Sequence, residues 1–90
     1  MQILATPTFL KIIKKLHPNQ KKAVDRAVQT ISVDPAKGSP KVGDLDGIAI
    51  YKFRMNDQQW LLAYRIMSKK SVKLLLIGPH ENFYRDLKGN

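Results

Sequence analysis

Two apolar runs separated by four polar residues place the strongest constraint on how this 90-residue chain can fold. The runs are Ile48–Met55 and Trp60–Met67, both rich in β-branched, aromatic and aliphatic residues, and the polar segment Asn56–Gln59 lies between them. This composition predicts two adjacent antiparallel strands joined by a tight turn. A third run, Val72–Ile77, is almost entirely apolar, which is typical of a central strand buried on both faces.

Cations interrupt these predicted strands at positions that share a face. Because side chains alternate across a sheet, Lys52 and Arg54 lie on the same side. A two-residue turn at Asp57–Gln58 would pair Arg54 with Leu61, and Arg65 would then project from that side too. A slip of one residue in register would send Arg65 to the opposite side. The alternative interpretation is that all three are ordinary solvated positions on a half-exposed sheet.

Length, composition and charge narrow the class of protein. The chain is expected to form one domain, residues 1–90, that buries enough surface to fold without disulfides or a structural metal. It has no cysteine for a disulfide or a thiolate metal site. No apolar run is long enough to span a membrane and no signal peptide is evident, so a cytoplasmic protein is expected. Sixteen Lys and Arg against seven Asp and Glu give a net charge of +9. A domain this basic is expected to bind nucleic acid or an acidic protein.

The amino-terminal half predicts two helices. Met1–Ala5 reads as a short edge strand, and Thr6-Pro7 supplies a capping hydroxyl followed by proline at the first helical position. His17-Pro18 ends this helix, since the residue before proline is disfavoured in the α region. A second helix is expected over about Pro18–Val33, followed by a long connection, Asp34–Gly47, that is full of helix breakers. The fold class is therefore α+β, with an αα-hairpin covering one side of the later strands.

The carboxyl-terminal segment brings a histidine and an aromatic residue together. Gly78-Pro79 ends the third strand, and Glu81–Lys88 is expected to form a short helix on which His80 and Tyr84, one turn apart, face the same way. The alternative is that His80 only caps the helix and that the aromatic residues only dock it.

Taken together, the pattern resembles the RelE/ParE superfamily of bacterial toxins from type II toxin–antitoxin pairs. The resemblance spans nearly the whole chain and depends on the order and spacing of its parts: the Asp34-Pro35 turn after two helices, Leu45–Gly47, Tyr51–Arg54, Trp60–Arg65, and Leu76–Gly78 followed by His80 and Tyr84. The fold that it implies, an αα-hairpin on a small, mostly antiparallel, curved sheet, agrees with the independent prediction from the residues.

The resemblance also implies a function. Some members of the superfamily are ribosome-dependent mRNA endonucleases, and others poison DNA gyrase. The spacing of His80 and Tyr84 looks most like the YafQ-type endonucleases, where a histidine and an aromatic residue four positions later lie at the active site. Lys52 and Arg54 fall where RelE carries two functional lysines, whereas Leu61 stands where RelE has a catalytic arginine. An mRNA endonuclease toxin is therefore expected, with a gyrase poison as the alternative.

RNA cleavage without a metal ion requires residues of these types. The 2′-OH attacks the adjacent phosphate, so the reaction needs a proton acceptor, a proton donor and cations around the transition state. We expect His80 to protonate the leaving oxygen and the forks of Arg54 and Arg65 to hold the phosphate oxygens. Lys52 is expected to act as the base if nearby cations keep it neutral, and otherwise as an electrostatic stabiliser. Tyr84 is expected to stack on a base.

The expected partners are the ribosome with its mRNA and an acidic antitoxin, or DNA gyrase if the toxin is a gyrase poison. No cofactor is expected, and no metal, because two histidines far apart in the sequence and scattered carboxylates give no ligand spacing. Besides an endonuclease and a gyrase poison, a third possible function is that of a basic module that binds RNA and transfers no proton. General contacts with ribosomal RNA are expected from the lysines outside the strands: Lys11, Lys14, Lys15, Lys21, Lys22, Lys37, Lys41, Lys69 and Lys70.

Overall fold

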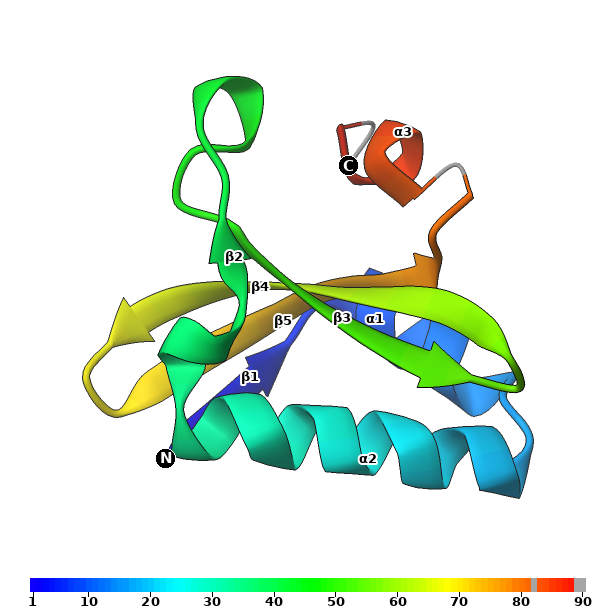
Figure 1. Cartoon of the computed structure of the whole chain (residues 1–90). Coiled ribbons are helices and arrows are strands. Elements are labelled where there is room, and N and C mark those ends of the chain that lie inside the picture. Colours follow the sequence, from blue (N-terminus) through cyan, green and yellow to red (C-terminus); the bar gives the residue numbers. More distant parts are fainter. Residues whose placement is uncertain (82, 89–90) are drawn as a thin grey trace.

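One five-stranded sheet with helices on both faces makes up the computed structural model, which describes residues 1–81 and 83–88 (Figure 1). The strand order is β1-β5-β4-β3-β2, and β1 is the one strand that runs parallel to its neighbour. The elements in chain order are β1 (Gln2–Ala5), α1 (Pro7–Lys14), α2 (Pro18–Val33), the 3-10 turn η1 (Pro35–Lys37), β2 (Ser39–Pro40), the 3-10 turn η2 (Gly43–Leu45), β3 (Ala49–Met55), β4 (Gln58–Ser68), β5 (Ser71–Pro79) and α3 (Phe83–Lys88). The predicted α+β class and mostly antiparallel sheet are confirmed.

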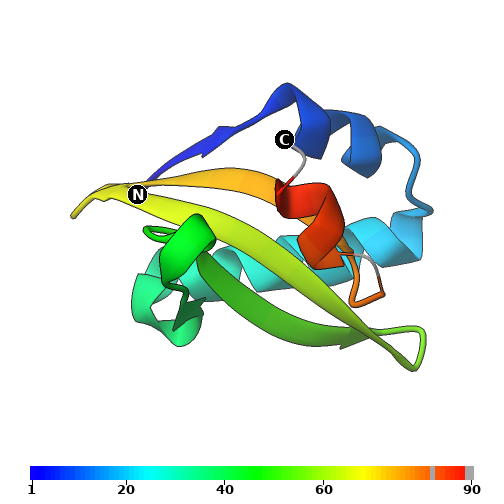
Figure 2. The same ribbon diagram turned by 90° about the horizontal axis from the view of Figure 1, so that it is seen from above.

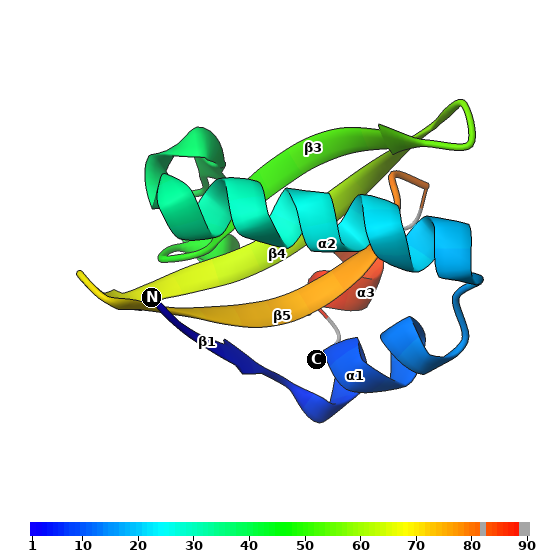
Figure 3. The same ribbon diagram turned by 90° about the horizontal axis from the view of Figure 1, so that it is seen from below.

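The two amino-terminal helices begin where the sequence predicts, and α2 ends at the predicted Val33, whereas α1 ends at Lys14, before the predicted break at His17-Pro18. The Thr6 hydroxyl accepts a hydrogen bond from the Phe9 N–H (3.1 Å) and donates one to the carbonyl of Leu75 (2.8 Å), so it caps α1 and also ties it to β5. Proline follows the cap in both helices, at the position where its missing N–H has no intrahelical partner to lose. Figure 3 shows α1 and α2 lying against the same face of the sheet.

The β3–β4 turn differs from the sequence prediction. It is formed by Asn56 and Asp57, both at positive φ (53° and 61°), rather than by Asp57-Gln58. Asparagine and aspartate tolerate this left-handed conformation better than glutamine does, and a two-residue hairpin turn with two positive φ values matches the strand twist. Arg54 therefore pairs with Gln59 and not with Leu61. Compared with the predicted register, every cross-strand partner of a β3 residue is shifted by two positions along β4. Each side chain therefore keeps the face that was predicted for it.

Each face of the sheet carries its own apolar cluster. The face covered by α1 and α2 buries Leu62, Tyr64 and Leu74 against Phe9 and Ala27. The terminal helix α3 covers the opposite face, here called the α3 face (Figure 2). A second cluster is buried between that face and α3. Its members are Ile48, Ile50, Leu61, Ala63, Leu76, Phe83 and Leu87. Strands β4 and β5 are buried on both faces in the middle of the sheet, as the apolar run Val72–Ile77 predicts.

The terminal helix is shorter than expected. α3 spans Phe83–Lys88, so His80 lies in a bend before it and not on it, while Asn82 lies outside the described residues. The backbone N–H of His80 donates to the carbonyl of Gln59 (3.0 Å), which extends the β4–β5 pairing by one bond past the end of β5. No helix among the described residues has the length and apolar content that crossing a membrane requires.

A buried tyrosine fixes the connection that follows α2. Tyr64 on β4 is fully buried, and its hydroxyl donates to the carbonyl of Pro35 while accepting a hydrogen bond from the Gly38 N–H (2.9 Å). Gly38 has no room for a side chain, because a Cβ there would lie 2.8 Å from Cε1 of the Tyr64 ring. The phenol therefore holds the start of the 34–47 connection, whose later part reaches the α3 face.

Alkaline pH is expected to weaken the fold through this tyrosine. Burial raises the pKa of the Tyr64 phenol above its ordinary value of 10.0, and the negative charge of Asp34 raises that pKa further, although the Gly38 hydrogen bond opposes the shift. The unfolded chain then loses this proton first, so the free energy of unfolding should be constant below pH 10 and fall as the pH rises through the raised pKa. Urea unfolding at pH 9 to 11 measures this fall. Tyr64→Phe should lack that component, and an identical pH dependence in both proteins would contradict the assignment.

Candidate functional site

Four of the five predicted site residues gather at one end of the α3 face. Arg54, Gln59 and His80 form one row across the sheet, because Arg54 pairs with Gln59 and the His80 N–H bonds to Gln59. Lys52 lies in the next row, opposite Leu61. Two strand spacings of about 4.8 Å separate β3 from β5, so the backbones of Arg54 and His80 are about 10 Å apart, within reach of a long arginine side chain.

The histidine and the tyrosine are in contact. The rings of His80 and Tyr84 meet edge to face, with centroids 6.2 Å apart, and Tyr84 also meets the ring of buried Phe83 at 5.7 Å. Phe83 and Leu87 anchor α3, which leaves Tyr84 half-buried and His80 exposed. The i and i+4 spacing therefore places the pair together even though His80 precedes the helix.

A lysine of the long 34–47 connection also reaches Tyr84 of this cluster. Lys41, just after β2, is half-buried, and its Nζ lies 5.6 Å from the centre of the Tyr84 ring. A cation above an aromatic face contributes about 0.5–1 kcal/mol at an exposed site. Nearby, Lys88 of α3 and Asp44 of η2 form an exposed ion pair at 3.9 Å, which contributes little by itself. No local sequence signal reveals the Lys41 contact, since it depends on how the 34–47 connection folds back.

The two strand cations of the cluster are exposed and lack acidic neighbours. No carboxylate of the described residues lies within 4.0 Å of Lys52 or Arg54. The Arg54 guanidinium donates to the backbone carbonyl of Asp57 (3.0 Å), so the turn holds the fork near the end of the hairpin. This end of the α3 face thus presents two basic side chains, Lys52 and Arg54, beside an imidazole. Lys41 starts from the other end of that face, where its N–H donates to the Ile48 carbonyl, and only its side chain reaches Tyr84.

Arg65, the fifth predicted residue, is on the α3 face but at its other end. It lies six residues along β4 from Gln59, which is about 20 Å at the rise of an extended strand. Its cross-strand partner is Lys73, and its guanidinium lies against Gly47, where a Cβ would be 2.5 Å from Nη1. The structure therefore separates Arg65 from His80, and the expectation that both surround one phosphate is wrong for this arrangement. Sharing a face does not bring residues together along a strand.

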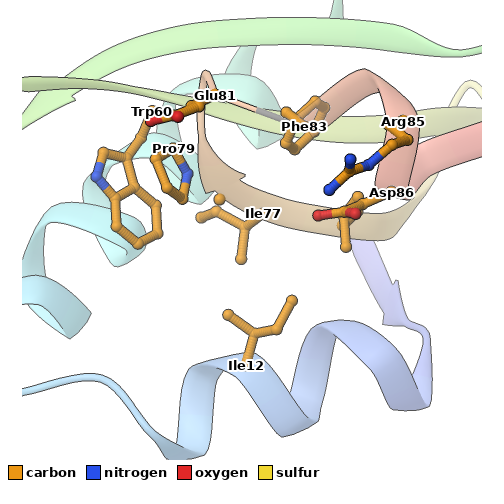
Figure 4. A pocket seen from close by; sticks show the side chains of 10 residues that line it. Ile12, Trp60, Ile77, Pro79, Glu81, Phe83, Arg85 and Asp86 are labelled. Atoms are coloured by element: carbon orange, nitrogen blue, oxygen red, sulfur yellow. The ribbon is translucent and has the colours of Figure 1, made fainter.

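A mainly apolar cavity of about 350 Å³ adjoins the cluster without containing it (Figure 4). It opens between α1, the end of β5 and α3, with Trp60 and Pro79 at one side and Ile12 below. Glu81, Arg85 and Asp86 add charges to its lining, whereas none of the predicted site residues lines it. The candidate cluster is accordingly an open surface, which suits an extended polymer better than a small enclosed substrate.

The described residues offer no metal centre: no three His, Asp or Glu side chains among them lie close enough together to hold an ion. The cluster can supply positive charges, an imidazole that can transfer a proton, and an aromatic ring half open to solvent.

Comparison with known proteins identifies the family. Residues 3–88 match the model of the ParE-like toxins of type II bacterial toxin–antitoxin systems. The chain belongs to this toxin family. No curated protein sequence gives a significant match to the toxin.

Two solved structures share the fold of this toxin. The intact E. coli RelBE toxin–antitoxin complex contains a chain that superimposes with a TM-score of 0.69 at 17% identity, covering 89% of this chain and 96% of that one. The isolated E. coli RelE toxin superimposes with a TM-score of 0.67 at 16% identity, covering 98% of this chain and 96% of that one. At such low identity the likeness establishes the RelE-like fold. It confirms the fold that the sequence predicts, and the match to the family model confirms the superfamily.

Proposed function

We propose that this toxin is a ribosome-dependent mRNA endonuclease that inhibits translation in the cytoplasm. The observation that carries the proposal is the gathering of Lys52, Arg54, His80 and Tyr84 at one end of the α3 face, with the His80 and Tyr84 rings 6.2 Å apart. A proton-transfer group, phosphate-binding cations and a stacking ring are what metal-free RNA cleavage requires.

The proposed reaction is a transesterification within the RNA. The 2′-oxygen attacks the adjacent phosphorus, the bond from phosphorus to the 5′-oxygen breaks, and the products are a 2′,3′-cyclic phosphate and a 5′-hydroxyl. His80, as the imidazolium, donates its proton to the departing 5′-oxygen. Arg54 holds the non-bridging oxygens, and Lys52 takes the 2′-OH proton if it is neutral or otherwise adds positive charge. Leu61 is fully buried beneath α3, so the place where RelE has a catalytic arginine contributes no cation here.

The open, basic surface supports the partners proposed with this activity. A strand of mRNA held in a ribosome can lie across an exposed cluster, and the exposed lysines of α1 and α2 would contact ribosomal RNA with a strong salt dependence. The cognate antitoxin would be acidic, since complementary charge speeds association with a partner of charge +9.

A second candidate function is poisoning of DNA gyrase, because the matching family model is described as ParE-like. Inducing the toxin in cells separates the two. If the toxin is an mRNA endonuclease, new mRNA 5′ ends should appear inside translated regions at positions that follow the reading frame, and no DNA damage response should appear. Intact messages together with a DNA damage response would support the gyrase poison and overturn the endonuclease.

Substitutions of Tyr84 test the stacking role. Tyr84→Ala should lower cleavage of ribosome-bound mRNA by about 5- to 150-fold, which corresponds to the roughly 1–3 kcal/mol of one base–aromatic stack. Tyr84→Phe keeps the ring and should stay within about threefold of the wild type. Single-turnover cleavage measures both. Equal losses in the two variants would show that the hydroxyl, and not the ring face, is what the reaction uses.

A further inference from the structure

Arg65 and Lys73 form a pair that local stability alone does not explain. They are directly opposed on the α3 face of β4 and β5, and both are half-buried. Like charges directly opposite each other on an antiparallel pair are destabilising. No carboxylate of residues 1–81 or 83–88 lies within 4.0 Å of either side chain, and the structure shows no hydrogen bond from the Arg65 guanidinium to these residues. A bound anion would turn this repulsion into attraction.

The surroundings of Arg65 provide space for such an anion. Arg65 lines a cavity of about 260 Å³ together with Thr6, Thr8 and Leu87. Gly47, at φ +85°, leaves room for the guanidinium beside the backbone, because a Cβ there would lie 2.5 Å from Nη1. The observed position of the fork beside the cavity therefore depends on glycine at this position.

We propose that Arg65 and Lys73 form a second phosphate-binding site, which holds the RNA backbone a few nucleotides away from the linkage that is cut. A guanidinium fork and an ammonium on neighbouring strands, with the Thr8 hydroxyl at the adjoining cavity, offer several donors to the oxygens of a phosphate. The site is on the same sheet face as the cluster at His80, about 20 Å along β4 at the rise of an extended strand. α3 lies between the two, and its exposed Arg85 and Lys88 supply cations on the way.

The proposal rests on the proposed function only in taking RNA as the polyanion. The test is therefore binding of uncleavable, 2′-O-methylated single-stranded RNA by the purified full-length toxin, measured by fluorescence anisotropy at several salt concentrations. Arg65→Gln, Lys73→Gln and the double variant are compared with Arg26→Gln, which removes one exposed charge from α2 on the opposite face. A decanucleotide can reach both sites, whereas a trinucleotide can occupy only one.

The expected result is that each single substitution weakens decanucleotide binding by about 3- to 10-fold and lowers the salt slope by about one phosphate contact. Trinucleotide binding at the His80 end should change by less than twofold in these variants, and decanucleotide binding by the Arg26→Gln control should also stay within twofold of the wild type. Lys73→Gln should also raise Tm by about 1–5 °C by relieving the repulsion, a gain that a purely structural role would not give.

Three outcomes would overturn the proposal. The first is a decanucleotide affinity in both single variants that equals that of Arg26→Gln. The second is absence of RNA binding by the wild-type toxin. The third is that the single variants lose binding to an acidic peptide but keep their binding to RNA. The last outcome would make this a peptide-carboxylate site. Binding that depends on Arg65 in a toxin that never cuts mRNA would refute the endonuclease function and leave the phosphate site standing.

Discussion

Replacing His80 by alanine is expected to lower mRNA cleavage by about 10²- to 10⁴-fold, the range that a positioned general acid contributes. The imidazole is exposed beside the half-buried Tyr84, so its removal leaves no buried gap, and the fold should be unaffected. Cells that express His80→Ala should grow where cells that express the wild-type toxin stop. Growth rate after induction, together with cleavage by the purified toxin on translating ribosomes, measures the loss.

The second histidine of the chain provides the matched control. His17 precedes α2, is exposed, and uses its backbone N–H to bond the side chain of Gln20 (2.9 Å), a bond that alanine keeps. His17→Ala should therefore remain as toxic as the wild type. If His80→Ala also arrests growth and cuts mRNA at the wild-type rate, the imidazole takes no part in the reaction.

Replacing Tyr64 by phenylalanine is expected to lower the free energy of unfolding by about 2–3 kcal/mol. The substitution keeps the ring but removes both hydrogen bonds, so the buried Gly38 N–H and the Pro35 carbonyl lose their partner at about 1–3 kcal/mol for each unsatisfied group. For a domain of this size the change corresponds to a fall in Tm of about 10 °C or more.

A tyrosine on strand β3 serves as the comparison for this prediction. Tyr51 is half-buried, stacks on Phe53 with ring centroids 6.1 Å apart, and its hydroxyl makes no hydrogen bond to the described part of the chain. Tyr51→Phe should change stability by less than about 0.5 kcal/mol. Equal effects of the two substitutions in thermal and urea unfolding would mean that the Tyr64 hydroxyl does not hold the 34–47 connection.

Most of the fold could be predicted from sequence patterns that involve only a few neighbouring residues. The Thr6-Pro7 start, the His17-Pro18 break and the apolar runs each depend on neighbours in the sequence, and the structure has helices and strands at those places. The turn was misplaced by one residue, since Asn56-Asp57 and Asp57-Gln58 differ only in how well their second residue tolerates positive φ.

The site was predicted less completely, because it depends on contacts between distant segments. Alternation along a strand assigned Lys52, Arg54 and Arg65 to one face, yet a face is as long as its strand, and Arg65 is at the far end. The Lys41 contact with Tyr84 and the opposition of Lys73 to Arg65 arise only once the 34–47 connection and the strand registers are fixed. In the sequence, Lys73 stands out only as the single cation within the otherwise apolar run Val72–Ile77.

The most direct test of the account is cleavage of a defined mRNA on translating ribosomes with purified toxin, followed by analysis of the new ends. The account predicts a 2′,3′-cyclic phosphate and a 5′-hydroxyl at the cut, and no cut when the ribose 5′ to that linkage lacks its 2′-hydroxyl. Cleavage of the 2′-deoxy message at the same place, or an uncut ribosome-bound mRNA under conditions where the toxin arrests growth, would contradict it.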